Sequence, residues 1–219
     1  MSEIVYLSNV RLSFPHFVEP QRTKNEQTGK ERISYNCELL MSPDHDGFKK
    51  FMQLYSKMMT EKYKEHAQSV MTLIQNDRKS RCYGQGEEKV NKKTFQPYDG
   101  HVGMVYITAG KDTRPQVFKQ DGTLVDPMNT MEYQQVVREM YAGCRVNAAV
   151  KPWLQDNQHG RAVRCEIIAI QFAGNDTPFG EGQVDVSGMF NPVNTAPAPA
   201  FLAPQPQNSS MPFPPFMSK

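Results

Sequence analysis

The stretch that decides the fold is CRVNAAVKPWLQDNQHGRAVRCEIIAIQF, residues 144–172. From Cys144 to Val150, apolar side chains recur at every second position, which is typical of a β-strand with one face in a core. Val163–Phe172 predicts another strand, whose ends are apolar on both faces. Asp156-Asn157 and His159-Gly160 lie between them and favour a tight reversal. The stretch therefore predicts two strands joined by a turn.

Three more segments alternate in the same way and predict three more strands. The side chains expected to share a face are Ile4, Tyr6, Ser8, Val10 and Leu12 in the first, Ile33, Tyr35, Cys37, Leu39 and Met41 in the second, and Val102, Met104, Tyr106 and Thr108 in the third. Between Val117 and Leu124, Gln120-Asp121-Gly122 favours a hairpin turn.

Apolar residues recur at helical spacing from Phe48 to about Gln75, with Asp44 or Asp46 as the expected N-cap. A shorter helix is expected from Thr130 to Met140. Five or six strands with hairpin turns and one or two inserted helices predict a mainly β fold. The pattern favours a small mixed barrel over a doubly wound sheet.

The composition changes sharply near Met189. From Asn191 to Lys219 there are eight prolines, no acid and a single base, the terminal lysine. Such a segment buries too little apolar surface to offset its ordering entropy, so it should be disordered. We expect a folded domain over residues 1–180 and a disordered tail over 181–219. The aromatic residues of the tail, Phe201, Phe213 and Phe216, are candidate anchors for a protein partner.

Several classes of function lack support in the sequence. There is no phosphate-binding glycine loop, nucleophile elbow or zinc-protease motif, so no catalytic residue and no cofactor are expected. The four cysteines form no C-x-x-C pair and the five histidines are scattered, so no metal site is expected either. The cysteines are expected to be free thiols in a reducing cytoplasm. No apolar run approaches the ~20 residues that cross a bilayer, which favours a soluble protein.

One segment combines bases with aromatic residues. Nine bases lie from Arg78 to Lys119 and, with Asp77, five acids, a local charge of +4 against +2 for the whole chain. Proteins that bind single strands need this mixture, because cations follow the phosphates while aromatic faces stack on bases. The predicted DNA-binding residues are Arg78, Lys79, Arg81, Tyr83, Lys92, Lys93, Phe95, Tyr98, Lys111, Arg114, Lys119, Lys151 and Trp153.

The same residues have a structural interpretation. The bases would then form an ordinary solvated loop, and Tyr106 and Phe118 would be core residues of strands. We favour the core for Tyr106, and exposure for Tyr83, Phe95 and Tyr98, which lie in Gly-, Lys- and Asn-rich sequence. For Trp153 the two alternatives stay open.

Two blocks of sequence carry a resemblance. NVRLSFPHF at 9–17, followed by Glu19-Pro20, resembles the start of a family of phage single-stranded-DNA-binding proteins. So do YAGCRVNA at 141–148 and the segments that follow it, Gln155-Asp156-Asn157, Gly160, Ile170-Gln171-Phe172 and Pro178-Phe179-Gly180. The resemblance covers most of residues 5–181. It implies an OB-fold-like five-stranded barrel that binds single-stranded DNA non-catalytically during phage replication or recombination, in the cytoplasm of the infected host cell.

The chain departs from the pattern of such proteins in two ways. Many single-strand binders end in an acidic tail that recruits replication enzymes, whereas residues 191–219 of this chain are uncharged up to Lys219. The long helix lies between the second and third strands, so we expect an insertion or an additional strand.

The leading hypothesis is a sequence-tolerant binder that coats unpaired DNA, with replication or recombination proteins as further partners through the tail. The alternatives are a phage structural or adaptor protein that works through its Pro-rich tail, and a recombination mediator that loads another protein. A nuclease ranks last, because it would need an acidic metal cluster that the sequence does not supply.

Overall fold

The computed structural model describes residues 3–24, 29, 31–158 and 160–180. The chain divides into two units, Met1–Gly182 and Gln183–Lys219. The predicted tail lies outside the described residues.

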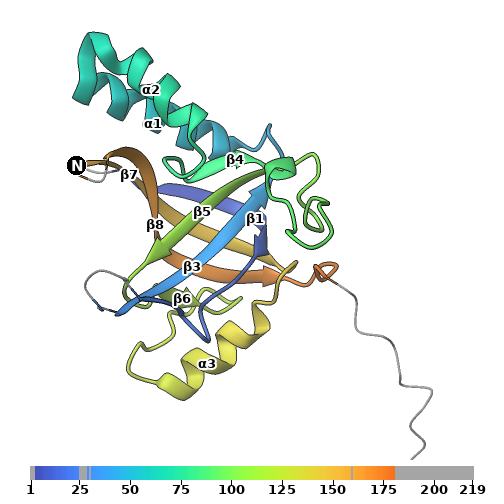
Figure 1. Cartoon of the computed structure of the whole chain (residues 1–219). Coiled ribbons are helices and arrows are strands. Elements are labelled where there is room, and N and C mark those ends of the chain that lie inside the picture. The colour runs from blue at the N-terminus through green and yellow to red at the C-terminus, as the bar shows by residue number, and fades with distance from the viewer. Residues whose placement is uncertain (1–2, 25–28, 30, 159, 181–219) are drawn as a thin grey trace, which may run out of the picture. The chain divides into compact units, whose positions relative to one another are not determined.

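The described part is mainly β with inserted helices (Figure 1). The strands are β1 Val5–Ser13, β2 Gln21–Lys24, β3 Glu31–Met41, β4 Tyr83–Gln85, β5 Val105–Lys111, β6 Gln116–Phe118, β7 Arg145–Asn157 and β8 Gly160–Gly174. They form one sheet in the order β4-β5-β3-β1-β7-β8-β6, and β2 pairs with β3. All the pairs are antiparallel except β6 with β8.

The sheet has more strands than the five or six expected. The short strands β2 and β4 were not predicted, and at β6 only the hairpin turn that follows it was. Within the described ranges, no ladder joins β4 to β6, the two ends of the path. The sheet curls instead, so that β5 comes to lie beside β8. The Lys111 ammonium of β5 lies 3.0 Å from the Glu166 carboxylate of β8.

The predicted hairpin over residues 144–172 is confirmed. β7 and β8 pair antiparallel from Arg145↔Gly174 to Asn157↔Gly160. Val146, Ala148 and Val150 are buried in the core, as their period-two spacing predicts.

The predicted face of the first strand is wrong in its first half. Ile4 and Tyr6 are exposed, whereas Val5 and Leu7 belong to the core. The cause is a β-bulge, because the register with β7 shifts between Leu7 and Val10, and Asn9 has a φ of 53°. An extra residue in a strand moves the following side chains to the other face. Val10 and Leu12 therefore lie in the core, as predicted.

The predicted face of the third strand is also out of phase. β5 begins only at Val105, and Val105, Ile107 and Ala109 belong to the core cluster. Tyr106 is buried, as expected, but on the opposite face, where the Lys89 ammonium lies 4.5 Å from its ring centroid. Val102 is exposed in the preceding loop.

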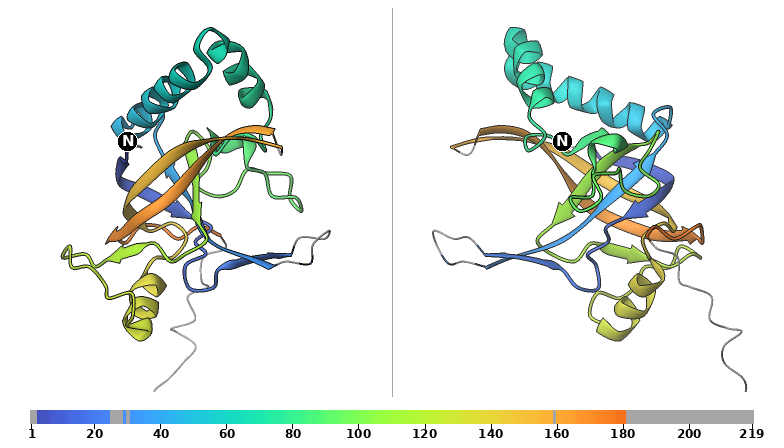
Figure 2. Two further views of the ribbon diagram at one scale, coloured as in Figure 1. Left: turned by 90° about the vertical axis from the view of Figure 1, so that its left-hand side faces the viewer. Right: turned by 45° about the vertical axis from the view of Figure 1, so that its right-hand side comes forward.

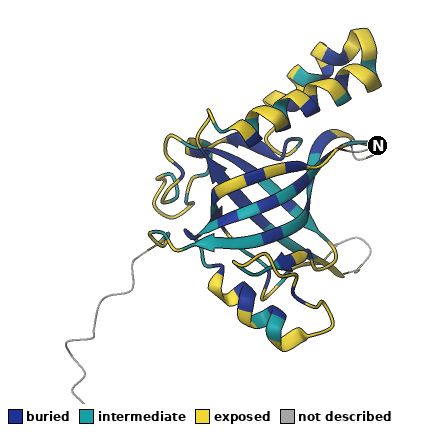
Figure 3. Ribbon diagram, turned by 180° about the vertical axis from the view of Figure 1, so that it is seen from behind, coloured by how far each residue is buried: buried dark blue, intermediate teal, exposed yellow. Residues whose placement is uncertain are grey.

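The long predicted helix is interrupted. α1 spans Asp46–Tyr63 and α2 spans Ala67–Asn76, and they are joined by a short 3-10 turn, Lys64–His66. Lys64 has a φ of 50°, which ends α1. The N-cap is His45 rather than Asp44 or Asp46, since its Nδ1 accepts the hydrogen bond from the Gly47 amide. In Figure 3 much of the insert is exposed, with buried positions along it, and the buried residues of α1 include Phe51, Tyr55 and Met59.

The shorter helix is confirmed. α3 spans Thr130–Glu139, and the Asn129 side chain caps it by accepting from the Glu132 amide. The turn at Gln120–Gly122 is confirmed as well, because the Lys119 amide donates to the Thr123 carbonyl. α1 and α2 lie at one end of the sheet, and α3 lies at the other (Figure 1).

The four cysteines are free thiols, as predicted, and all four are buried. In the part of the chain that the structure describes, no helix is long and apolar enough to cross a membrane. No three His, Cys, Asp or Glu side chains gather into a metal-binding group among the described residues.

Candidate nucleic-acid interface

A groove of about 640 Å³ crosses the outer face of the sheet. It is lined by β2, β3, β5, the β7–β8 hairpin and the segment that leads from α2 to β4. The lining includes the cationic residues Arg32, Arg78, Lys79, Arg81 and Arg164, and the rings of Phe14, His16 and Trp153. We call it the sheet groove.

The floor of the sheet groove is polar because it is the outer face of two strands. Ser34, Asn36 and Glu38 of β3 line it together with Thr108 and Gly110 of β5. In β3 these residues alternate with apolar side chains that pack on the core, so the period of two that builds the core also builds the floor.

One wall is formed by the β7–β8 hairpin. Trp153 and Arg164 are direct partners in the ladder, and Trp153 is 43% exposed. The Arg164 guanidinium donates to the Gln155 side-chain oxygen at 3.2 Å and to the Lys79 carbonyl at 2.8 Å. These bonds fasten the hairpin to the segment that carries Arg78 and Lys79, and leave the Trp153 ring available for stacking.

The segment from α2 to β4 contains three of the predicted residues. Lys79 is exposed, and Arg78 is exposed with its guanidinium near the backbone and carboxylate of Glu88. Arg81 is buried, pairs with the Glu88 carboxylate at 2.8 Å and donates to the Tyr83 carbonyl. Arg81 therefore holds this segment together, and its charge is largely committed within the protein.

The opposite side of the groove contains residues that sequence reasoning missed. Arg32 and its partner Asp112 form two hydrogen bonds of 2.9 and 3.1 Å at the exposed surface. Phe14 follows β1 with a φ of 46°, an uncommon conformation for a residue with a Cβ. His16 lies two residues further on, and its amide is hydrogen-bonded to the Asn36 carbonyl.

Glu38 is a buried acid in the groove floor whose charge is compensated. Its carboxylate accepts from Lys89 and, at 3.4 Å, from the Thr108 hydroxyl, and it lies 3.5 Å from His101 Nε2. Burial alone would raise the pKa of Glu38, but the interactions with His101 and Lys89 outweigh it and hold that pKa below its usual value. An ionised Glu38 thus ties the loop over residues 86–104 to the floor.

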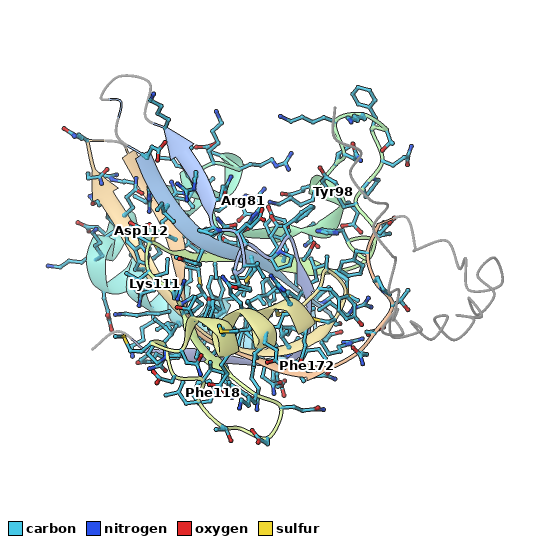
Figure 4. All side chains as sticks on the ribbon, turned by 90° about the horizontal axis from the view of Figure 1, so that it is seen from below. Arg81, Tyr98, Lys111, Asp112, Phe118 and Phe172 are labelled. Carbon is cyan, nitrogen blue, oxygen red and sulfur yellow. The ribbon has the colours of Figure 1, made fainter. Side chains whose placement is uncertain are left out.

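That loop carries four predicted residues outside the groove lining. Lys92, Lys93 and Phe95 are exposed, and Phe95 is 79% exposed with a φ of 57°. Tyr98 is half-buried, and its ring meets the Phe14 ring edge-on with centroids 4.9 Å apart. Through Phe14, the loop adjoins the end of the sheet groove, and Tyr98 lies on the same side of the molecule as Arg81 (Figure 4).

The remaining predicted cations, Lys111, Arg114, Lys119 and Lys151, do not line the groove, and the first three have partners within the protein. Lys111 pairs with Glu166, which lies opposite Lys151 in the β7–β8 ladder. The Arg114 guanidinium lies 4.9 Å from the Tyr133 ring centroid, and Lys119 pairs with Glu132 at 2.5 Å. Figure 4 shows Phe118 and Phe172 beside α3, away from Arg81 and Tyr98.

The expected exposure of Tyr83 is wrong. Tyr83 is buried, its ring packs between those of Phe51 and Tyr55, and its hydroxyl donates to Gln75. It lies on β4, a strand too short and too glycine-rich to be predicted. Its apolar neighbours come from α1, so no local pattern reveals its burial.

The comparisons with known proteins place the chain among phage proteins. Residues 3–197 match the family described as Enterobacter phage Enc34, ssDNA-binding protein. The solved single-stranded DNA-binding protein from bacteriophage Enc34 is 25% identical, with a TM-score of 0.58 over 86% of this chain and 90% of that one. A structure of that protein in complex with ssDNA is 24% identical, with a TM-score of 0.58 over 81% and 89% of the two chains. Protein p50 of Acyrthosiphon pisum secondary endosymbiont phage 1 is 25% identical over 91% of this chain and 98% of its own length.

Proposed function

The chain belongs to the Enterobacter phage Enc34 ssDNA-binding protein family, and from this premise we propose that it binds single-stranded DNA in the sheet groove. It would coat unpaired DNA without regard to sequence and protect it during phage replication or recombination, in the cytoplasm of the infected cell. Membership of this family confirms a binding protein rather than an enzyme.

One observation carries the assignment to the groove. The fold brings Trp153 and Phe14, which are far apart in the sequence, into one groove with Lys79, Arg78 and Arg164. Aromatic faces supply stacking for bases and the cations supply contacts to phosphates, the two terms that bind single strands. Neither term distinguishes one base from another, which is why we propose sequence-tolerant binding.

We also propose that the curled sheet is an OB-fold-like barrel. The approach of β5 to β8 supports this description, together with the hydrogen bond from the Val163 amide of β8 to the Ser80 carbonyl. Folds of this class bind oligonucleotides across the outer face of their strands, which is where the sheet groove lies.

The proposal is tested by titrating the protein with a fluorescently labelled oligo(dT) and with a duplex of equal length. We expect tighter binding to the single strand, and an affinity that falls by about tenfold or more from 50 to 200 mM salt. Equal affinity for the two forms would contradict the stacking contribution. Absence of binding to either at low salt would refute the proposed function.

A pair of lysine variants tests the location. Lys79→Ala removes an exposed cation of the groove, and should lower the slope of log affinity against log salt by about 0.7 if Lys79 neutralises one phosphate. Lys50→Ala removes an exposed cation of α1 that does not line the groove, and should leave the slope unchanged. The opposite ranking would place the DNA elsewhere.

A further inference from the structure

The outer part of the β7–β8 hairpin is a two-stranded ribbon. In the described residues, β1 pairs with β7 only up to Val150, and β6 pairs with β8 only at residues 169–171. From Lys151 to Glu166 the two strands therefore pair only with each other. An isolated two-stranded ribbon is marginally stable in water, so its position depends on what holds it from outside.

This ribbon carries part of the sheet groove. Trp153, Gln155 and Arg164 all lie on it, and Trp153 is the only tryptophan of the chain. A small rotation of the ribbon would move both a stacking ring and a cation relative to the groove floor. The affinity for DNA should therefore be sensitive to the contacts that hold the ribbon in position.

Val163 and Cys165 of the ribbon pack in the core, and Glu166 pairs with Lys111 of β5. Among the described residues, two further polar attachments hold the ribbon closer to its tip. On one side, Val163 and Arg164 bond to the backbone of Ser80 and Lys79. On the other, Asp156 near the tip of the ribbon meets the last turn of α1. Figure 2 shows this tip beneath the helical insert.

The second attachment is a compact cluster around one carboxylate. The Tyr63 hydroxyl donates to Asp156 Oδ2 at 3.0 Å, and the Lys62 ammonium lies 3.4 Å from the same oxygen. Arg161 Nε lies 3.5 Å from Asp156 Oδ1, and the guanidinium carbon lies 5.3 Å from the Tyr63 ring centroid. The bond from Tyr63 is the main cause that lowers the pKa of Asp156, so the carboxylate is ionised at neutral pH.

We propose that this cluster is a latch through which the α1–α2 insert positions the wall of the DNA groove, with Tyr63 and Asp156 as positioning residues. The inference rests on the proposed function. Neither residue lines the groove, and they act through the placement of Trp153 and Arg164.

The latch predicts a change in DNA affinity opposite in sign to the change expected from net charge alone. Removing the negative charge of Asp156 makes the protein more cationic, which by itself strengthens binding to a polyanion. If Asp156 positions the ribbon, the Asp156→Asn substitution weakens binding instead. Tyr63→Phe removes only the hydroxyl and changes no charge, so it tests the latch without an electrostatic contribution.

The experiment compares Asp156→Asn, Tyr63→Phe and the wild-type protein. The control is Glu65→Gln, which makes the same change of charge on the exposed turn of the same insert. Acrylamide quenching of Trp153 fluorescence in the free proteins measures the freedom of the ribbon. We expect stronger quenching in both latch variants, and affinities for oligo(dT) that fall by about three- to tenfold, a loss of about 0.7–1.4 kcal/mol. Glu65→Gln should show wild-type quenching and an equal or slightly higher affinity.

Two outcomes overturn the inference. One is wild-type quenching in both latch variants. The other is an affinity that is unchanged in Tyr63→Phe and raised in Asp156→Asn to the same extent as in Glu65→Gln. Failure of the proposed function is distinguishable, because a wild-type protein that does not bind oligo(dT) can still show the quenching difference. Thermal unfolding of each variant verifies that the fold is retained.

Discussion

Trp153 is the residue on which the groove interpretation depends most directly. Its ring is partly exposed, so its truncation removes little buried surface, yet it lies among the groove cations. A stacked base contributes ~1–3 kcal/mol. We expect Trp153→Ala to weaken oligo(dT) binding by about 5- to 150-fold and to change the melting temperature little, while Trp153→Phe retains most of the affinity.

Fluorescence anisotropy with a labelled oligonucleotide measures this effect. Leu73→Ala is the matched control, because Leu73 is an exposed apolar residue of α2 that does not line the groove. If Trp153→Ala bound as tightly as Leu73→Ala, the bases would have to stack elsewhere, and Phe14 and Phe95 would be the next residues to substitute.

Because of Glu38, the stability of the fold depends on pH, and the sign of this dependence can be predicted. The folded-state pKa of Glu38 is lowered, so its ionisation stabilises the fold fully above the unfolded pKa of about 4.3, and the contribution is lost as the pH falls through the folded pKa. Glu38→Gln should cost ~1–3 kcal/mol at pH 7, because Lys89 loses a buried acceptor charge. Urea unfolding at several pH values should show this difference as constant from pH 7 to about 5.5 and smaller below about 4.3. A difference that grew at low pH would contradict the assignment.

At the scale of elements, the long and regular strands and helices could be predicted from the sequence. β3, β7 and β8 each have a period of two over many residues, and the insert has an apolar stripe at helical spacing. The short strands were missed because three or four residues cannot establish a period. The face of β1 was partly wrong because the bulge at Asn9 has no hydrophobic signature.

The loop over residues 86–104 depends on close backbone approach at Gly86. A Cβ at this position would overlap the carbonyl oxygen of His101, which is backbone and cannot rotate away. Gly86→Ala should therefore destabilise the protein by ~1–3 kcal/mol or more. Gly122→Ala is the comparison, since Gly122 has a φ of 84° but open space around its Cα, and should cost about 1 kcal/mol. Equal losses in the free energy of unfolding for the two variants, measured with urea, would show that the loop rearranges at Gly86 to accommodate a Cβ.

At the scale of the whole molecule, the residues of the candidate site could be predicted only in part. Local clustering of bases and aromatics identified Arg78, Lys79 and Arg81, which line the groove. Trp153 lies outside that cluster and was included with two alternatives open, and it lines the groove as well. The cluster also included Arg114 and Lys119, which the fold places near α3 with partners of their own. Arg32 and Arg164 were missed because they reach the groove only through strand pairing. A signal was present, since polar residues alternate with the core residues of these strands, but the sequence does not show which outer faces meet.

The tail lies outside the described residues, so its expected behaviour follows from its composition alone. Residues 191–219 contain eight prolines, no acid and no alternating pattern, so they should contribute nothing to the folded core. Deletion from Asn191 onward should leave the melting temperature nearly unchanged, because few buried contacts would be lost.

The charge of the tail decides the effect of the same deletion on DNA binding. An acidic tail would occupy a cationic groove, and its removal would raise the affinity. The deleted residues 191–219 carry only the base Lys219, so they cannot compete with DNA in that way. We therefore expect an unchanged affinity for an oligonucleotide that fits one molecule. On a long strand the deletion could still alter contacts between neighbouring molecules through Phe201, Phe213 and Phe216. Anisotropy with one short and one long substrate separates the two effects, and a large gain for the truncated protein on the short one would mean that the phenylalanines of the tail cover the stacking surface.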